Sequence, residues 1–193
     1  ILARFHEIGI SVNPEDPKVA LLVEQVKERE FEGYSYDGAG ASFELLARRT
    51  LGKVPEYFRC NSFRVLDERR WNAKGELVIM SEATVKLTVN GEEYMTLAEG
   101  NGPVNALDMA LRKVLTPIFP TLEDLRLVDF KVRILRSKDA SAAMPRVMIE
   151  STSDKGEHWS TVGVSTNIIE ASYEALRDSI VYKLYRDGVA LHI

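Results

Sequence analysis

The fold is decided by residues 83–103, which read ATVKLTVNGEEYMTLAEGNGP. The first seven residues alternate between apolar and polar side chains, which is the period of a strand with one buried face. Asn90-Gly91 is a strong hairpin signal, and residues 92–99 then return as the partner strand. Gly102-Pro103 indicates the start of a helix with proline in its first turn. The stretch therefore predicts strand, hairpin, strand and helix in that order.

A similar pattern occurs twice in the chain. Phe63-Arg64-Val65 opens the first unit, and Phe130-Lys131-Val132 opens the second. The helices that close the two units, residues 104–112 and 169–177, have alanine, alanine, leucine and arginine in register. Chance likeness between two amphipathic helices is the alternative, but a similar strand pattern precedes each helix. The sequence therefore predicts an internal βββα repeat.

The second unit carries its own strand and turn signals. Residues 128–134 alternate apolar with polar side chains, and Val147 and Ile149 mark a further strand. Residues 153–156 indicate a turn, after which the chain returns along residues 159–164. Asn167 is expected to cap the closing helix, because asparagine is a favoured N-cap residue.

The first 53 residues differ in character, since they indicate helices. Asp16-Pro17 predicts a helix start, and Gly33 predicts its end. A second helix is expected over residues 41–51, after a turn-rich loop, and the charged run Glu28-Arg29-Glu30 is interpreted as solvated. The predicted class is α+β: a helical linker subdomain at 1–53, then two βββα repeats at 54–193 packed with pseudo-twofold symmetry, helices against sheets.

Composition narrows the possible partners. The 193 residues carry a net charge of −4, which disfavours nucleic acid and anionic membranes because both require a basic face. No apolar run approaches the roughly 18 residues that span a bilayer. The single Cys60 fits a reducing cytosol, so a cytoplasmic location is expected. The chain opens Ile1-Leu2-Ala3 with helical spacing and no preceding cap, which is typical of a piece of a longer protein.

The residues offer binding chemistry rather than catalysis. The three histidines are scattered, and no nucleophile, paired-carboxylate or zinc motif is present. The loop Glu99–Ala106 is glycine-rich and leads into a helix, whose free N–H groups and dipole favour an anion such as a carboxylate. Residues 163–169 are its counterpart in the second unit and include two hydroxyls. Both loops could instead be plain helix caps without a ligand.

Four stretches carry a family resemblance. They read SEATV at 81–85, EGNGPVNA at 99–106, LVDFKV at 127–132 and IIEAS at 168–172. They resemble the C-terminal regulatory domain of the 2-isopropylmalate synthase and citramalate synthase family. Residues 32–46 are most similar to the citramalate synthase branch.

The resemblance implies that catalysis and regulation belong to different domains of the protein. In this family a TIM-barrel domain ahead of the regulatory domain condenses acetyl-CoA with a 2-oxo acid, using a divalent metal. That barrel is missing here, so this chain is expected to need no cofactor and to have no synthase activity alone. Residues 1–53 would be the linker subdomain, and residues 54–193 the amino-acid-binding and homodimerising regulatory domain.

The resemblance also implies an allosteric ligand, isoleucine or alternatively leucine, held between the two repeats. Two other interpretations remain, an enzyme in its own right and a dimerisation module without a ligand. The residues expected to form the pocket come from both repeats. They are Gly100, Asn101, Gly102, Pro103, Val104 and Asn105, the apolar strand residues Phe130, Val132 and Ile134, and Ser165, Thr166, Asn167 and Ile168.

Overall fold

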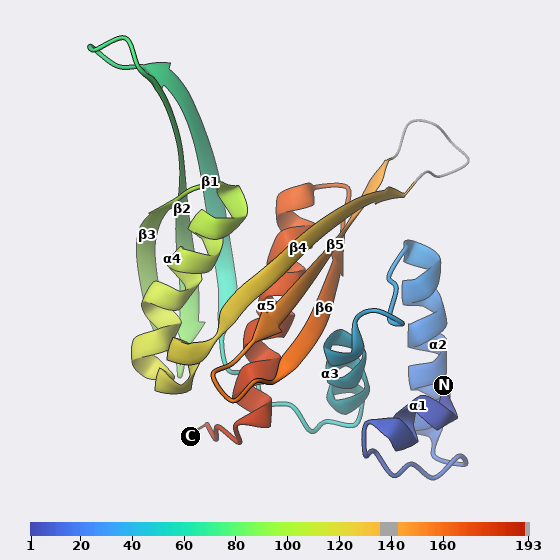
Figure 1. Cartoon of the computed structure of the whole chain (residues 1–193). Coiled ribbons are helices and arrows are strands. Elements are labelled where there is room, and N and C mark those ends of the chain that lie inside the picture. The colour runs from blue at the N-terminus through green and yellow to red at the C-terminus, as the bar shows by residue number, and fades with distance from the viewer. Residues whose placement is uncertain (136–142, 192–193) are drawn as a thin grey trace. The chain divides into compact units, whose positions relative to one another are not determined.

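The computed structural model describes residues 1–135 and 143–191. Figure 1 shows the order of the elements, three helices followed by two βββα repeats, which confirms the predicted α+β class. The helices are α1 (Leu2–Glu7), α2 (Pro17–Glu32), α3 (Gly40–Thr50), α4 (Pro103–Ile118) and α5 (Ile168–Arg186), with a short 3₁₀ helix η1 (Pro120–Asp124). The strands are β1 (Arg59–Trp71), β2 (Leu77–Val89), β3 (Glu92–Gly100), β4 (Arg126–Leu135), β5 (Met144–Thr152) and β6 (His158–Val164).

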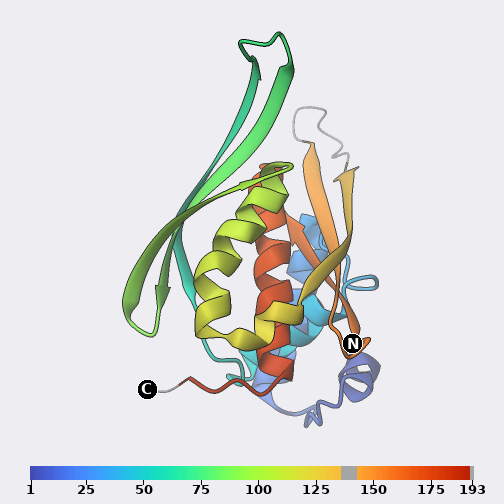
Figure 2. The ribbon, with the colours of Figure 1, turned by 60° about the vertical axis from the view of Figure 1, so that its left-hand side comes forward.

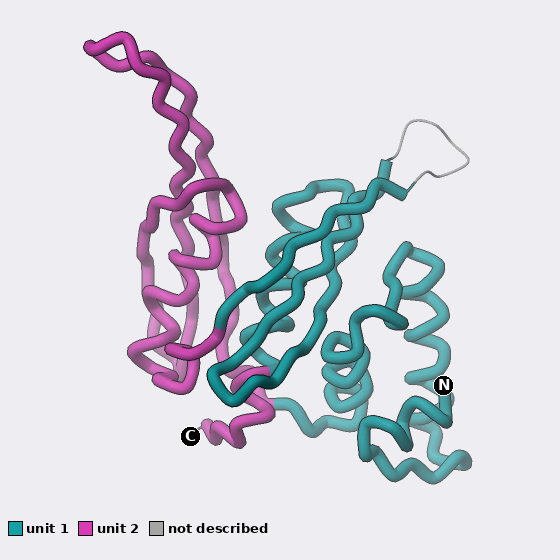
Figure 3. The backbone as a smooth tube through the Cα atoms, in the orientation of Figure 1, with its two compact units in different colours: residues 1–54, 126–182 teal, residues 55–125, 183–193 magenta. Residues whose placement is uncertain are grey.

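The chain divides into two compact units (Figure 3). The first unit consists of residues 1–54 and 126–182, and the second of residues 55–125 and 183–193. The helical segment therefore shares a compact unit with the second repeat. The predicted boundary at residues 53 and 54 concerns functional domains, and it stays a prediction.

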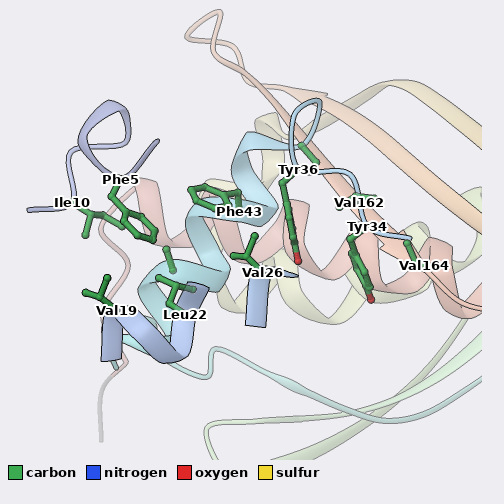
Figure 4. Packing of buried hydrophobic residues seen from close by; sticks show 12 residues of the cluster. Phe5, Ile10, Val19, Leu22, Val26, Tyr34, Tyr36, Phe43, Val162 and Val164 are labelled. Carbon is green, nitrogen blue, oxygen red and sulfur yellow. The ribbon is translucent and has the colours of Figure 1, made fainter. Parts of the chain in front are cut away.

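In the first unit the helical segment packs on the sheet β4-β5-β6. Asp16 caps α2 by accepting a hydrogen bond from the Lys18 N–H at 2.9 Å, and Gly33 ends this helix with φ of 113°. Aromatic rings of α1 and α3 stack, since Phe5 and Phe43 have centroids 5.7 Å apart. Figure 4 shows how the cluster continues from these helices to β6. Its buried members include Phe5, Ile10, Val19, Leu22, Val26, Tyr34, Tyr36, Phe43, Val162 and Val164.

In the second unit α4 lies along the antiparallel sheet β1-β2-β3 (Figure 2). The alternating residues of β2 behave as expected, because Ala83, Val85 and Leu87 are fully buried. Asn90 and Gly91 both have positive φ, as the predicted tight hairpin requires. The pairing of β1 with β2 runs out to Trp71 opposite Leu77, while β3 ends opposite Ser81. The β1–β2 hairpin therefore extends past the third strand.

The two repeats match in detail beyond their element order. The first strand of each repeat has a register shift, between Cys60 and Ser62 in β1 and between Leu127 and Asp129 in β4. Phe63 and Phe130 directly follow these irregularities. A glycine of the third strand also meets an alanine of the helix in both repeats, as described below. These shared irregularities support the internal repeat, because chance likeness of two helices would not produce them.

Candidate functional site

The first predicted loop lies between β3 and α4 in the second unit. A Cβ atom on Gly100 would lie 2.5 Å from the Ala106 nitrogen and 2.6 Å from Asn105 Oδ1. Gly100 is thus needed for the approach of the strand end to the helix. Gly102 has an extended φ of −170°, and a Cβ atom there would meet nothing within 4 Å. The loop therefore has free space beside Gly102, whereas the start of α4 fills the space beside Gly100.

The start of α4 retains backbone donors. Pro103 is the first helical residue, and no described side chain caps this end. Asn105 Oδ1 instead accepts a hydrogen bond from the Asn101 N–H at 3.1 Å, which shapes the loop ahead of the helix. Val104 is half-buried, while Asn101 and Asn105 are exposed. The positive end of the helix dipole therefore faces an accessible loop, as the sequence indicated.

The second loop differs at this point. Asn167 Oδ1 accepts hydrogen bonds from the N–H groups of Ile169 at 2.9 Å and Glu170 at 3.2 Å. Ser165 Oγ accepts a further bond from the Asn167 N–H at 3.1 Å. The predicted cap is confirmed, and unlike the start of α4 this helix start has the N–H groups of Ile169 and Glu170 already paired. Ile168 is exposed at the helix start.

The three predicted wall residues lie on one face of β4. Phe130 pairs with Ile149, Val132 with Val147, and Ile134 with Pro145. This is the face that α5 covers on the neighbouring strand, because Ser151 and Ser179 hydroxyls are 2.6 Å apart. On edge strand β4 the face is only partly covered, since Phe130, Val132 and Ile134 are 41%, 40% and 53% exposed. The pocket that they were expected to line stays a prediction.

Two of the predicted residues, Ser165 and Thr166, line a groove that lies wholly within the first unit. We call it the α2–α5 groove, and its volume is about 470 Å³. Ligand pockets in proteins are commonly of about this size. The lining residues are Arg29, Glu32 and Tyr34 from the helical segment, with Met144, Val164, Ser165, Thr166 and Glu174 from the second repeat.

Tyr34 and Glu174 fix the wall of this groove. The Tyr34 hydroxyl donates a hydrogen bond to Glu174 Oε2 at 2.6 Å, and the Val164 N–H donates to the same oxygen at 3.2 Å. Burial, followed by the hydrogen bond to Glu174, raises the pKa of Tyr34, so its hydroxyl stays a donor at neutral pH. The Arg29 guanidinium lies over the Tyr34 ring, 4.9 Å from its centroid. Figure 4 shows Tyr34 beside Val164 of β6.

A second, smaller cavity of about 40 Å³ lies next to this groove and shares Arg29, Tyr34 and Glu174 with it. Its polar lining centres on Asp178, which accepts hydrogen bonds from Ser42 Oγ at 2.9 Å and from both terminal nitrogens of Arg49 at 3.1 Å. The cavity has room for about one water molecule. The hydrogen bonds of Asp178 to Ser42 and Arg49 tie α3 to α5.

Sequence reasoning missed Arg29, Tyr34 and Glu174. The interpretation of residues 28–30 as solvated charge holds for all three, because Glu28, Arg29 and Glu30 are exposed, and Arg29 in addition lies over an aromatic ring and lines a groove. Tyr34 was placed in a turn-rich loop, and Glu174 was treated only as part of a helix. Tyr34 and Glu174 are 140 residues apart in the sequence, so no pattern of neighbouring residues indicates their hydrogen bond.

Two other classes of site can be considered for the described residues. Within residues 1–135 and 143–191, no group of three or more His, Cys, Asp or Glu side chains could hold a metal ion. In the same ranges no helix is long and apolar enough to cross a membrane.

These features define a class, an α+β domain built from paired βββα repeats with small-residue loops before each helix. Residues 37–184 match the family model of the LeuA allosteric (dimerisation) domain. The match covers most of the chain, so the chain belongs to this family of allosteric dimerisation domains. Arg29 and Glu32 of the α2–α5 groove, as well as Tyr34, lie outside the matched residues.

The chain is also similar to longer proteins. It is 47% identical over 187 residues to the (R)-citramalate synthase of Aquifex aeolicus, covering 97% of this chain and 35% of that protein. It is 48% identical over 186 residues to that of Geobacter sulfurreducens, covering 96% and 34%. A 2-isopropylmalate synthase of Pseudoalteromonas atlantica is 36% identical over 155 residues, covering 75% and 28%. The chain thus spans about a third of the length of these relatives.

Proposed function

We propose that this chain is the isoleucine-binding regulatory and dimerisation region of a cytoplasmic citramalate synthase. The parent enzyme would condense acetyl-CoA with a 2-oxo acid. Its divalent metal and catalytic residues would belong to a region outside the 193 residues, so this chain would be inactive alone.

The observation that carries the proposal is the extent of the similarity to (R)-citramalate synthases. Identity of 47–48% extends over 96–97% of the chain for the two relatives described above. The 2-isopropylmalate synthase of Pseudoalteromonas atlantica matches less of the chain at lower identity. Membership of an allosteric family adds the expectation of a small effector. A leucine-binding domain of a 2-isopropylmalate synthase is the second candidate.

The chemistry of the loops is compatible with a branched amino acid. The open start of α4 favours a carboxylate at Gly102–Asn105, while the hydroxyls of Ser165 and Thr166 can bind either charged end. Aliphatic side chains such as Val132 and Ile134 would contact the branched side chain, whose burial contributes about 1.5–3 kcal/mol. The expectation that the two loops share one ligand stays a prediction.

Calorimetry with isoleucine and leucine tests this function. Valine at Gly102 fits the backbone, because φ is extended and the space is open. Gly102→Val should therefore fold and weaken isoleucine binding at least about tenfold, or roughly 1.4 kcal/mol. Gly40→Ala is the matched control, because a Cβ atom at Gly40 also meets nothing within 4 Å. Light scattering on the same samples should give twice 21.7 kDa.

Three outcomes would contradict parts of the proposal. Unchanged isoleucine affinity in folded Gly102→Val removes this loop from the site. Tighter binding of leucine than of isoleucine favours the 2-isopropylmalate synthase alternative. A dimer that binds none of the twenty amino acids is a dimerisation module without a ligand.

A further inference from the structure

The smaller cavity of the first unit, which we call the α3–α5 cavity, is lined by two hydrogen-bond donors that lack a partner. Tyr36 is only 3% exposed, and within residues 1–135 and 143–191 its hydroxyl makes no hydrogen bond. Arg177 of α5 also lines the cavity, and its Nε–H is buried without a partner among the same residues. Because buried donors in folded proteins are normally paired, the two together indicate a missing acceptor.

Packing fixes the position of the Tyr36 hydroxyl. The ring stacks beside that of Tyr34, with centroids 6.0 Å apart, and meets the edge of Phe43 at 5.9 Å. Figure 4 shows that the two tyrosine side chains point in the same direction. Burial raises the pKa of Tyr36, so the hydroxyl keeps its proton and stays a donor at neutral pH.

The carboxylates that line the cavity are already engaged with other donors. Asp178 accepts hydrogen bonds from Ser42 Oγ at 2.9 Å and from Arg49 at 3.1 Å. Glu174 Oε2 accepts from the Tyr34 hydroxyl at 2.6 Å. The acceptor for Tyr36 and for Arg177 Nε is therefore expected to come from outside the chain.

The charge of the lining favours an anion as this acceptor. The guanidinium groups of Arg29, Arg49 and Arg177 line the cavity together with only two carboxylates, those of Glu174 and Asp178. The lining therefore carries an excess of positive charge, which attracts a negative ion. A cation would instead face two unpaired donors, and the described residues include no group of three metal-ligating side chains.

The size of the cavity restricts the anion to a single atom. Its volume of about 40 Å³ has room for about one water molecule. Phosphate, sulfate and a free amino acid are all too large to enter. Chloride is only slightly larger than water and accepts hydrogen bonds from O–H and N–H groups alike.

We propose that the α3–α5 cavity binds one chloride ion, held by the Tyr36 hydroxyl and the Arg177 Nε–H. Tyr36 lies in the loop between α2 and α3, whereas Arg177 belongs to α5. The ion therefore bonds the helical segment to the second repeat within the first unit. Because the unfolded chain lacks this site, chloride stabilises that unit by mass action.

Urea denaturation of the 193-residue chain in sodium chloride and in sodium gluconate, at equal ionic strength, tests the site. Gluconate is too large for the cavity, so the wild-type urea midpoint should be higher in chloride and should rise with chloride concentration. Tyr36→Phe should show no such increase. In gluconate it should match wild type, because it loses no hydrogen bond to another protein group.

Two control variants separate the chloride response from general effects on stability and charge. Tyr182→Phe removes a hydroxyl from the same unit, one that bonds to Glu44 and does not line the cavity. Arg133→Gln removes a guanidinium from an exposed position on β4. Both should retain the full increase in chloride. Arg177→Gln should weaken chloride binding about tenfold, because it removes a hydrogen bond to a charged group.

Crystals grown in sodium bromide locate the ion directly. Wild type should give an anomalous peak between Tyr36 and Arg177, and Tyr36→Phe should lose it. Bromide peaks at the surface alone would mean an adventitious ion only and would overturn the proposal.

The urea midpoints give three further ways to overturn the proposal. Equal wild-type midpoints in the two salts would exclude chloride binding. An increase in chloride that persists in Tyr36→Phe would place the ion elsewhere. If Tyr36→Phe lowers the midpoint equally in both salts, a water molecule fills the cavity. None of these results depends on whether the chain binds isoleucine.

Discussion

Replacing Gly163 with alanine should destabilise the first compact unit, because this glycine lies directly against the backbone of α5. A Cβ atom built on Gly163 lies 1.9 Å from the Ala171 carbonyl oxygen, 2.8 Å from its carbon and 2.9 Å from Glu174 Cβ. Carbon–oxygen contacts normally begin near about 3.3 Å. The helix and β6 would have to separate by more than roughly 1 Å to accommodate the methyl group.

The loss of stability follows from the hydrogen bonds between β6 and α5 that this separation would disturb. Thr161 Oγ1 donates to the Ala175 carbonyl at 2.8 Å, and Trp159 Nε1 donates to the Ser179 carbonyl at 3.3 Å. Each such hydrogen bond contributes about 1 kcal/mol, and overpacking of a core costs about 1–3 kcal/mol. We expect Gly163→Ala to lower the free energy of unfolding by about 3 kcal/mol.

Urea denaturation followed by tryptophan fluorescence measures this loss. Trp159 is 6% exposed in the first unit whereas Trp71 is 64% exposed, so the fluorescence change on unfolding reports mainly on the first unit. Gly40→Ala in the same unit is the control, because it gains a methyl group in open space and should match or slightly exceed wild type. An unchanged urea midpoint for Gly163→Ala would refute the close packing of β6 against α5.

Two further predictions concern the polar contacts of the first unit. Asp178→Ala should lower the free energy of unfolding by about 2–3 kcal/mol, because it leaves Ser42 and Arg49 without their buried partner; a urea midpoint equal to that of wild type would contradict the role of Asp178 in tying α3 to α5. Burial raises the pKa of Tyr36, so the unfolded chain releases this phenolic proton first and stability should fall as pH rises above about 10. Urea midpoints between pH 8 and 11 should decline less steeply in Tyr36→Phe than in wild type, and equal slopes would exclude Tyr36 as a source of the decline.

Local chemistry was sufficient to predict most element boundaries. Asp16 and Gly33 bound α2, Asn90-Gly91 forms the hairpin turn, and Asn167 caps α5. In each case the signal and its consequence lie within a few residues of each other. A single residue type therefore carries the information, because it either tolerates positive φ or caps free N–H groups.

The same signals were less informative about whether a helix start or a glycine is available to a ligand. Residues 163–169 were interpreted as the counterpart of the Glu99–Ala106 loop, yet the Asn167 cap pairs the N–H groups of Ile169 and Glu170, whereas no side chain caps α4. Gly100 and Gly102 were expected to admit a ligand, yet only Gly102 faces open space. A glycine in the sequence does not reveal whether a ligand or the protein's own backbone lies next to it.

The partners of the helical segment could not be predicted, because an apolar helix face indicates burial without naming the surface that buries it. The residues next to Tyr34 indicated only a turn-rich loop. Its hydrogen-bond partner Glu174 lies 140 residues further along the sequence. Arg29 became part of a groove only through the fold of that loop onto β6. Residues that a linker would leave exposed are instead tied to the repeat whose loop carries two of the predicted site residues. The helical segment and the loop of the predicted site residues therefore belong to one packed unit, whereas a freely solvated linker would make no contact with that loop.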